Sequence, residues 1–149
     1  MKRPKLLGIG GAHVDRRGRM NAPYIPGASI PGTMQEETGG GVFNALRAAV
    51  QFGVSGSLIS ARGGDSAGDA VAAEAKRAGI EDLSSTFLDR NTASYTALLD
   101  MHGDVAAALA DMAIYETALP RIITRRMSRD AIAGANALLV DANMPEAAI

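Results

Sequence analysis

Three consecutive glycines, Gly39 to Gly41, stand directly before an alanine-rich helical pattern that reaches Gly53. Glycine has no Cβ atom, so it permits positive φ angles and a close approach of the backbone to a ligand. The free N–H groups at the helix start would face that ligand. Asn44, in the first turn, can both donate and accept hydrogen bonds. We therefore predict a binding site for a polar small molecule; a tight turn between a strand and a helix is the simpler alternative.

A second group of candidate residues follows the first apolar run of the chain. Residues 5–10 are typical of a buried strand of a parallel sheet, and this run ends at Gly10 and Gly11. Because ligands of open α/β sheets bind beyond the carboxyl ends of the strands, residues 12–17 lie where chemistry is expected. Asp15 can accept hydrogen bonds from hydroxyl groups there. A turn cap that pairs with a neighbouring arginine is an equal alternative.

A third motif, residues 63–69 (Gly-Gly-Asp-Ser-Ala-Gly-Asp), follows a second apolar run over residues 56–61. It looks like a phosphate cradle with a catalytic carboxylate, but it also precedes a helical pattern over residues 70–78. We favour the structural interpretation, in which Asp65 or Ser66 caps this helix and Gly79 ends it. With the triple glycine, these segments predict a strand, helix and strand that form a right-handed parallel unit.

The remaining pattern predicts strands and helices in alternation. Proline and glycine interrupt residues 18–35, which indicates short irregular strands and turns in a functional loop or lid. We expect a third strand over residues 83–88, and a hairpin over residues 92–112 that turns near His102, although its alanine-rich second arm also fits a helix. Helices interrupted at Pro120 should follow over residues 115–135. A last buried strand is expected over residues 137–141.

Composition limits the class of protein. The 149 residues suit one domain; 47% are hydrophobic and 21% charged, and the net charge is -1. The sequence has no long basic run of the kind that binds nucleic acid, so a nucleic-acid partner is not expected. The arginines between residues 121 and 129 fit a solvated helix face. The sequence has no run of eighteen consecutive apolar residues, so no membrane span is expected. The apolar run after the basic residues 1–5 is too short for a signal peptide. Cysteine is absent, so we expect a cytoplasmic protein.

These motifs together resemble the amino-terminal signature of the PfkB family, the ribokinase-like sugar and nucleoside kinases. The resemblance covers essentially the whole chain and uses Gly10 and Gly11 with Asp15, residues 39–45 with Gly53, and residues 63–68. It implies an α/β fold, a three-layer α/β/α sheet with a small β lid formed by residues of about 16–38 and 93–112. It also implies that Asp15, Gly40, Gly41 and Asn44 bind sugar hydroxyls, that ATP and Mg²⁺ take part, and that a homodimer forms through the lid.

Within this family, several short segments resemble the pseudouridine kinases. They are Pro31-Gly32, Thr92-Ala93-Ser94-Tyr95, Leu99-Asp100 with Gly103-Asp104, and Ala110-Asp111-Met112. A ribokinase more usually carries asparagine two residues before the aspartate, where this chain has His13, which we also place among the substrate-binding residues. The resemblance therefore implies phosphorylation of the 5'-hydroxyl of a ribosyl group, with pseudouridine as the expected substrate. Ribose or another sugar is the alternative.

The resemblance also indicates what this chain lacks. The family's Gly-Ala-Gly-Asp motif, which carries the phosphate-binding turn and the catalytic base, has no match in the right place. Residues 1–149 would then be the amino-terminal part of one kinase domain, truncated after its first half. Such a chain holds no catalytic residue and no metal ligand, and we expect it to be inactive by itself. Asn143, beyond the last strand, would reach the sugar or a magnesium-bound water.

Two other classes of protein are alternatives to a kinase. A non-catalytic binding or dimerisation module would use the lid sheet as its interface. A Rossmann dinucleotide domain is disfavoured, because the glycines at positions 8, 10 and 11 lack the third glycine at the proper spacing and no helix follows promptly.

Overall fold

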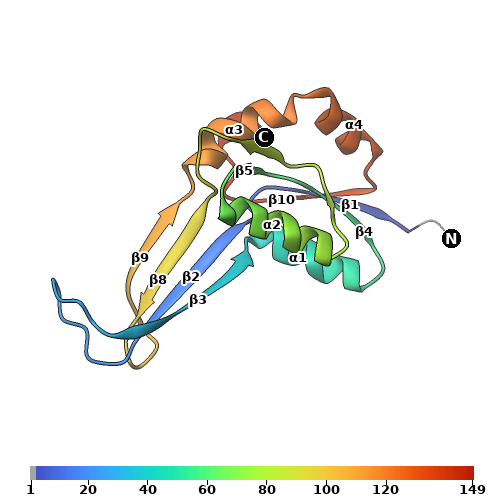
Figure 1. Ribbon diagram of the computed structural model, residues 1–149. Helices are drawn as coiled ribbons and strands as arrows, with labels where there is room; N and C mark the ends of the chain where they lie inside the picture. The colour runs from blue at the N-terminus through green and yellow to red at the C-terminus, as the bar shows by residue number, and fades with distance from the viewer. Residues whose placement is uncertain (1–2) are drawn as a thin grey trace.

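The computed structural model describes residues 3–149 and has a parallel sheet at its centre (Figure 1). Its four strands lie in the order β10-β1-β4-β6. They are β1 (Lys5–Ile9), β4 (Ser55–Ile59), β6 (Glu81–Asp82) and β10 (Ala137–Val140). The first two predicted strands correspond to β1 and β4, which are confirmed as parallel neighbours. A separate parallel pair, β5 (Ala61–Gly63) and β7 (Ser85–Phe87), extends the core beside β4.

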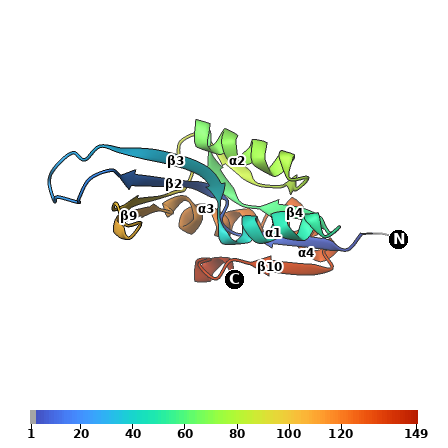
Figure 2. The same ribbon diagram turned by 90° about the horizontal axis from the view of Figure 1, so that it is seen from below.

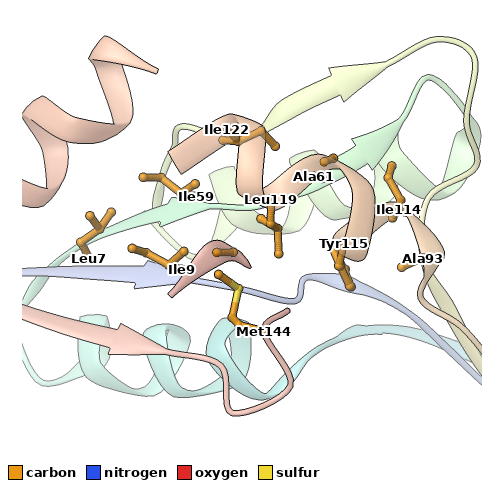
Figure 3. Close-up of a cluster of buried hydrophobic side chains, with 12 residues drawn as sticks. Leu7, Ile9, Ile59, Ala61, Ala93, Ile114, Tyr115, Leu119, Ile122 and Met144 are labelled. Atoms are coloured by element: carbon orange, nitrogen blue, oxygen red, sulfur yellow. The ribbon is translucent and has the colours of Figure 1, made fainter. Parts of the chain in front are cut away.

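Helices cover both faces of this sheet. On one face, α1 (Gly41–Gln51) and α2 (Ser66–Arg77) enclose a cluster of side chains that includes Phe43 and Leu58. On the other face, α3 (Ala113–Ile123) packs on Leu7 and Ile9 of β1, as Figure 3 shows, and α4 (Arg126–Gly134) follows it. Successive side chains of a strand point to opposite faces, which is why β1 serves both clusters. The predicted three-layer α/β/α arrangement is confirmed.

A second sheet projects from the core and forms the lid (Figures 1 and 2). Its strand order is β3-β2-β8-β9. The strands are β2 (His13–Met20), β3 (Gly32–Gly39), β8 (Ser94–Leu99) and β9 (Val105–Asp111). The hairpin predicted over residues 92–112 is confirmed, and the helical alternative for its second arm is wrong. Regular strand continues to Met20 and resumes at Gly32, so the irregular structure expected over residues 18–35 is confined to the stretch between them.

The helix boundaries correct two further expectations. Helix α2 begins four residues earlier than predicted, because the Asp65 side chain accepts the Gly68 N–H and caps the helix, while Gly79 ends it with φ 70°. Pro120 lies inside α3 and does not break it, so the predicted interruption is wrong. The carbonyl that Pro120 leaves without its helical partner belongs to Glu116, which is exposed and open to water.

Two strand predictions also need correction. The third strand expected over residues 83–88 is shorter than predicted: it is β7, Ser85–Phe87, which pairs with β5. The two-residue strand β6, which pairs with β4, lies before the predicted range and was not expected. Strand β10 exists as predicted but is not buried: Leu138 is 48% exposed and Val140 46% exposed. The reason is that β10 is the edge strand of its sheet, with one side of these residues uncovered. Among residues 3–149, no helix is long and apolar enough to cross a lipid bilayer.

Candidate functional site

A pocket of about 440 Å³ lies where the carboxyl ends of β1 and β10 meet the base of the lid. Its walls come from Gly10, Gly11 and His13 after β1, Gly41 at the start of α1, the end of β9, the first turns of α3, and the turn after β10. A second hollow of about 460 Å³ lies at the amino ends of β1 and β4. Because open α/β sheets bind ligands at the carboxyl ends of their strands, the pocket below the lid is the candidate site.

The triple-glycine turn packs against the connection between β1 and β2. Gly40 has φ 113°, and a Cβ atom there would overlap the carbonyl of Gly11. A Cβ atom on Gly39 would overlap the carboxylate of Asp15. Gly41 has open space at its Cβ position and lines the pocket. The predicted close approach of backbone is therefore present, and at Gly39 and Gly40 the group approached is the protein itself.

His13 and Asp15 form a pair at the start of β2. The Nε2 atom of His13 lies 3.2 Å from Oδ1 of Asp15, and both side chains are largely covered. Burial lowers the pKa of His13, and the carboxylates of Asp15 and Asp141 only partly oppose this effect. An uncharged imidazole then donates its Nε2 proton to Asp15. The alternative of a turn cap paired with an arginine is wrong for Asp15, because it lies within a strand and its partner is His13.

Tyr115, on α3, holds the backbone between β1 and β2. Its hydroxyl donates to the Ala12 carbonyl at 2.9 Å and accepts from the Ala12 N–H at 3.1 Å. Burial raises the pKa of Tyr115 well above its usual range, so the phenol keeps the proton that it donates. Figure 3 shows this side chain directed at the connection from the neighbouring helix. One side chain therefore satisfies both polar groups of a fully buried residue at the pocket.

Asp141 connects the end of β10 to the same backbone. Its Oδ2 atom accepts the Gly11 N–H at 3.2 Å, and its Oδ1 atom accepts the Asn143 N–H at 3.0 Å. Asn143 is exposed and lines the pocket from the other side. The carboxyl ends of two neighbouring strands thus bring polar groups to one pocket, as expected for a parallel sheet.

The predicted site residues fall into three groups. His13, Gly41 and Asn143 line the pocket directly. Asp15 and Gly40 adjoin it through their contacts with His13 and with the Gly11 backbone, respectively. Asn44 lies on the exposed side of α1, where its side-chain oxygen accepts from Arg47 at 2.9 Å, and it does not line the pocket.

Sequence reasoning missed Tyr115 and did not place Asp141 among the site residues. Asp141 was open to detection, because it directly follows a predicted strand at the edge where ligands bind. Tyr115 lies 103 residues from its partner Ala12, and an aromatic residue in a helical pattern is indistinguishable from an ordinary core residue. Within residues 3–149, no three His, Cys, Asp or Glu side chains gather in a way that could hold a metal ion. The donor set of these described residues does not fit a magnesium site of its own.

Comparisons with known proteins agree on the type of fold. No family model matches the chain. It is 28% identical over 142 residues to the uncharacterized sugar kinase YeiI of Escherichia coli K12. This alignment covers 95% of the present chain and 39% of the relative. A carbohydrate kinase from Agrobacterium tumefaciens is 48% identical, with TM-score 0.90 over 97% of this chain and 47% of that one.

A ribokinase from Arabidopsis thaliana, solved in complex with ribose and ATP, is 19% identical with TM-score 0.80. It aligns with 98% of this chain and 47% of its own. The chain thus spans about two fifths to one half of the length of these proteins. It has the ribokinase-like fold, and its homologues are sugar kinases.

Proposed function

We propose that this chain forms the acceptor-binding half of a carbohydrate kinase that transfers the γ-phosphoryl group of ATP to the 5'-hydroxyl of a ribosyl group. The observation that carries the proposal is the pocket under the lid, where the His13–Asp15 pair, the start of α1 and the turn after β10 meet. Its sugar-kinase homologues support the reaction class. An open sheet with polar groups at adjacent strand ends suits a polyol, which offers several hydroxyls to bind at once.

Each residue of the site has a defined chemical part in this proposal. The carboxylate of Asp15, oriented by the Nε2 proton of His13, accepts hydrogen bonds from sugar hydroxyls. The free N–H groups of the first turn of α1, beginning at Gly41, donate to the same ligand, and the positive end of the helix dipole supports an electron-rich oxygen there. The Asn143 amide closes the pocket opposite them. Asn44 joins the site only if it releases Arg47.

Placement is the main contribution of these residues to the reaction. Phosphoryl transfer depends chiefly on positioning and electrostatic stabilisation, so holding the acceptor hydroxyl in line accounts for much of the rate. The lid would close over the sugar and exclude water, which otherwise competes as the acceptor. ATP and Mg²⁺ belong to the proposed reaction, but the donor set that residues 3–149 offer does not fit the metal, and we assign the chain no catalytic base. We therefore expect the 149-residue chain to be inactive alone.

For the acceptor, we propose pseudouridine, with ribose as the alternative. His13 stands where a ribokinase more usually has asparagine, and this difference changes the hydrogen-bonding groups beside Asp15. An amide offers a donor and an acceptor on one rigid plane, whereas the uncharged imidazole uses its donor on Asp15.

A second candidate function is a non-catalytic module that dimerises through the lid. Large apolar side chains are exposed on the two edge strands of that sheet: Leu109 and Val105 of β9 are 70% and 60% exposed, and Met34 of β3 is 58% exposed. Exposed apolar patches of this kind mark protein interfaces. The same surface fits the homodimer expected for the kinase, so dimerisation alone does not separate the two candidates.

Isothermal titration calorimetry of the chain with pseudouridine and with ribose tests the proposed site. We expect binding that Asp15→Asn weakens at least about tenfold, because a hydrogen bond to a charged group contributes about 1.5–3 kcal/mol. Asp130→Asn, at an exposed position of α4, is the matched control and should bind as the wild type does. A dimer that ignores both ligands would favour the module. Substrate-dependent ATP turnover by the chain alone, in a coupled assay, would contradict the assignment of the catalytic base elsewhere.

A further inference from the structure

The point where the polypeptide enters lid strand β8 is fixed by a dense set of hydrogen bonds, here called the lid junction (Gly63, Asp65, Gly68 and Thr92). Asp65 Oδ2 accepts the Thr92 N–H at 2.9 Å. Asp65 Oδ1 accepts both the Thr92 hydroxyl at 2.5 Å and the Gly68 N–H at 2.8 Å. The Thr92 hydroxyl oxygen in turn accepts the Gly63 N–H at 2.9 Å. Both oxygens of the carboxylate are therefore engaged, and one of them only with the lid entry.

The glycines of the lid junction make room for this arrangement. A Cβ atom on Gly63 would overlap the carbonyl of Arg90 and lie 2.7 Å from the Thr92 nitrogen. A Cβ atom on Gly68 would lie 2.9 Å from the Thr92 hydroxyl oxygen. The segment before β8 thus crosses directly over the start of α2. The Gly-Gly-Asp motif is built around the lid entry as well as around the helix cap.

Capping alone does not require this design. A serine or asparagine at the first position accepts a helix N–H as well as an aspartate does. Only a side chain with two acceptor oxygens can take the Gly68 N–H and both donors of Thr92. Partial burial pushes the pKa of Asp65 upward, but the hydrogen bonds from Thr92 and Gly68 outweigh it, and the pKa lies below its ordinary value. The ionised carboxylate is thus the form that these contacts stabilise.

A short backbone path connects the lid junction to the pocket. Ala93, next to Thr92, accepts the Val14 N–H at 3.3 Å, and both residues are buried. Strands β8 and β2 then run parallel, with Tyr95 opposite Asp15. A displacement of Thr92 would therefore shift the strand that sets the position of Asp15.

We infer that Asp65 and Thr92 are positioning residues, which hold Asp15 beside His13 by fixing the point at which β8 leaves the core. The effect on sugar affinity rests on the function proposed above, whereas the effect on the His13–Asp15 pair does not. Asp65 touches neither the pocket nor its proposed ligand, so it acts only through Thr92 and the two strands.

The decisive variant is Thr92→Val, which has the same shape, removes the hydroxyl, and leaves the Asp65 cap of α2 intact. The first readout is the NMR titration of the two histidines of the chain. Asp15 raises the pKa of His13, as Asp141 does, so loss of the His13–Asp15 contact should move the His13 titration to lower pH. His102, in the hairpin turn of the lid, is the internal reference. Thr92→Ser, which restores the hydroxyl, should restore the wild-type titration.

Hydrogen exchange separates positioning from general destabilisation. In Thr92→Val, we expect faster exchange in β8 and β2 with α2 unchanged. Ala73→Gly, at an exposed position of α2, weakens that helix by about 1 kcal/mol without touching the lid junction and is the matched control. The inference is overturned if His13 titrates alike in Thr92→Val and wild type, or if Ala73→Gly produces the same change.

Sugar affinity is the last readout, and it separates this inference from the proposed function. If the wild type binds pseudouridine or ribose, Thr92→Val should weaken binding severalfold and Thr92→Ser should not. If the wild type binds neither but the His13 titration responds as expected, the positioning role stands and the proposed function fails. If the wild type binds and Thr92→Val binds equally well, the positioning role fails and the proposed function stands.

Discussion

The hydroxyl of Tyr115 is a sharp test of how the pocket floor is held. Tyr115→Phe removes one oxygen atom and keeps the aromatic packing on α3 and β1. It also removes the partner of both the N–H and the carbonyl of Ala12, which is 0% exposed. We expect the variant to fold with a distinctly less stable connection between β1 and β2.

The size of the loss follows from the two groups left unpaired. Each unsatisfied buried backbone group costs about 1–3 kcal/mol, so the extremes are about 2 and 6 kcal/mol. Tyr115 borders the pocket, from which water can enter and replace part of the hydrogen bonding. We therefore expect a loss at the lower end, about 2–3 kcal/mol in the free energy of unfolding. For a chain of this size, that corresponds to a fall of about 4–12 °C in Tm.

Urea denaturation followed by circular dichroism measures this loss directly. Tyr95→Phe is the matched control: Tyr95 is 36% exposed on lid strand β8, and its variant should stay within about 0.5 kcal/mol of wild type. A loss below about 0.5 kcal/mol in Tyr115→Phe, with an unchanged denaturant slope, would refute the role of the hydroxyl. A matching loss in Tyr95→Phe would show that the assay reports tyrosine hydroxyls in general.

Three further predictions concern the groups around the pocket. Gly40→Ala should lower the free energy of unfolding by about 2 kcal/mol or more, because φ is 113° and the new Cβ overlaps the Gly11 carbonyl. Gly41→Ala, with open space and helical backbone, should be neutral or stabilising by up to about 1 kcal/mol in the same urea denaturation. The pKa of His13 in the folded chain lies below its unfolded value of 6.5, so the unfolded chain binds more protons and the free energy of unfolding should fall as pH drops below 6.5, then level off below the folded pKa. His13→Asn should remove this pH-dependent component, and a pH profile that the variant leaves unchanged would contradict the prediction. Leu46→Ala, at a fully buried position of α1, should cost about 2–5 kcal/mol in the same denaturation assay, and a smaller loss would mean that this helix packs loosely.

The core was predictable because its pattern is strong. β1 and β4 are apolar runs bounded by glycine, and α2 ends at a glycine with a positive φ angle. Strand β6 was not predicted, and β7 was predicted to begin two residues too early, since strands of two and three residues are too short to show a periodic pattern. Their bounds depend on pairing with β4 and β5, which is a tertiary effect.

The lid was harder to predict from composition and was located by resemblance. Most residues of β3 are exposed, and β2 carries Arg16, Arg17 and Arg19, so neither strand shows a clean alternation of apolar and polar residues. Charged pairs across the two strands, such as Arg16 with Glu36, take the place of apolar contacts. The alternation of apolar and polar residues reflects burial of one face of a strand, so a sheet with few buried side chains shows only a weak pattern in the sequence.

The triple-glycine turn lies beside the pocket, and its role in binding a ligand stays a prediction. Gly39 and Gly40 are required by the protein's own packing, since their missing side chains admit the Asp15 carboxylate and the Gly11 carbonyl. Only Gly41 meets the pocket with open space at its Cβ position. The close packing of the first two glycines is what brings Asp15 and the start of α1 to the same place. A ligand that reaches both groups therefore depends on residues that it need not touch, and tolerance to alanine should rise from Gly39 and Gly40 to Gly41.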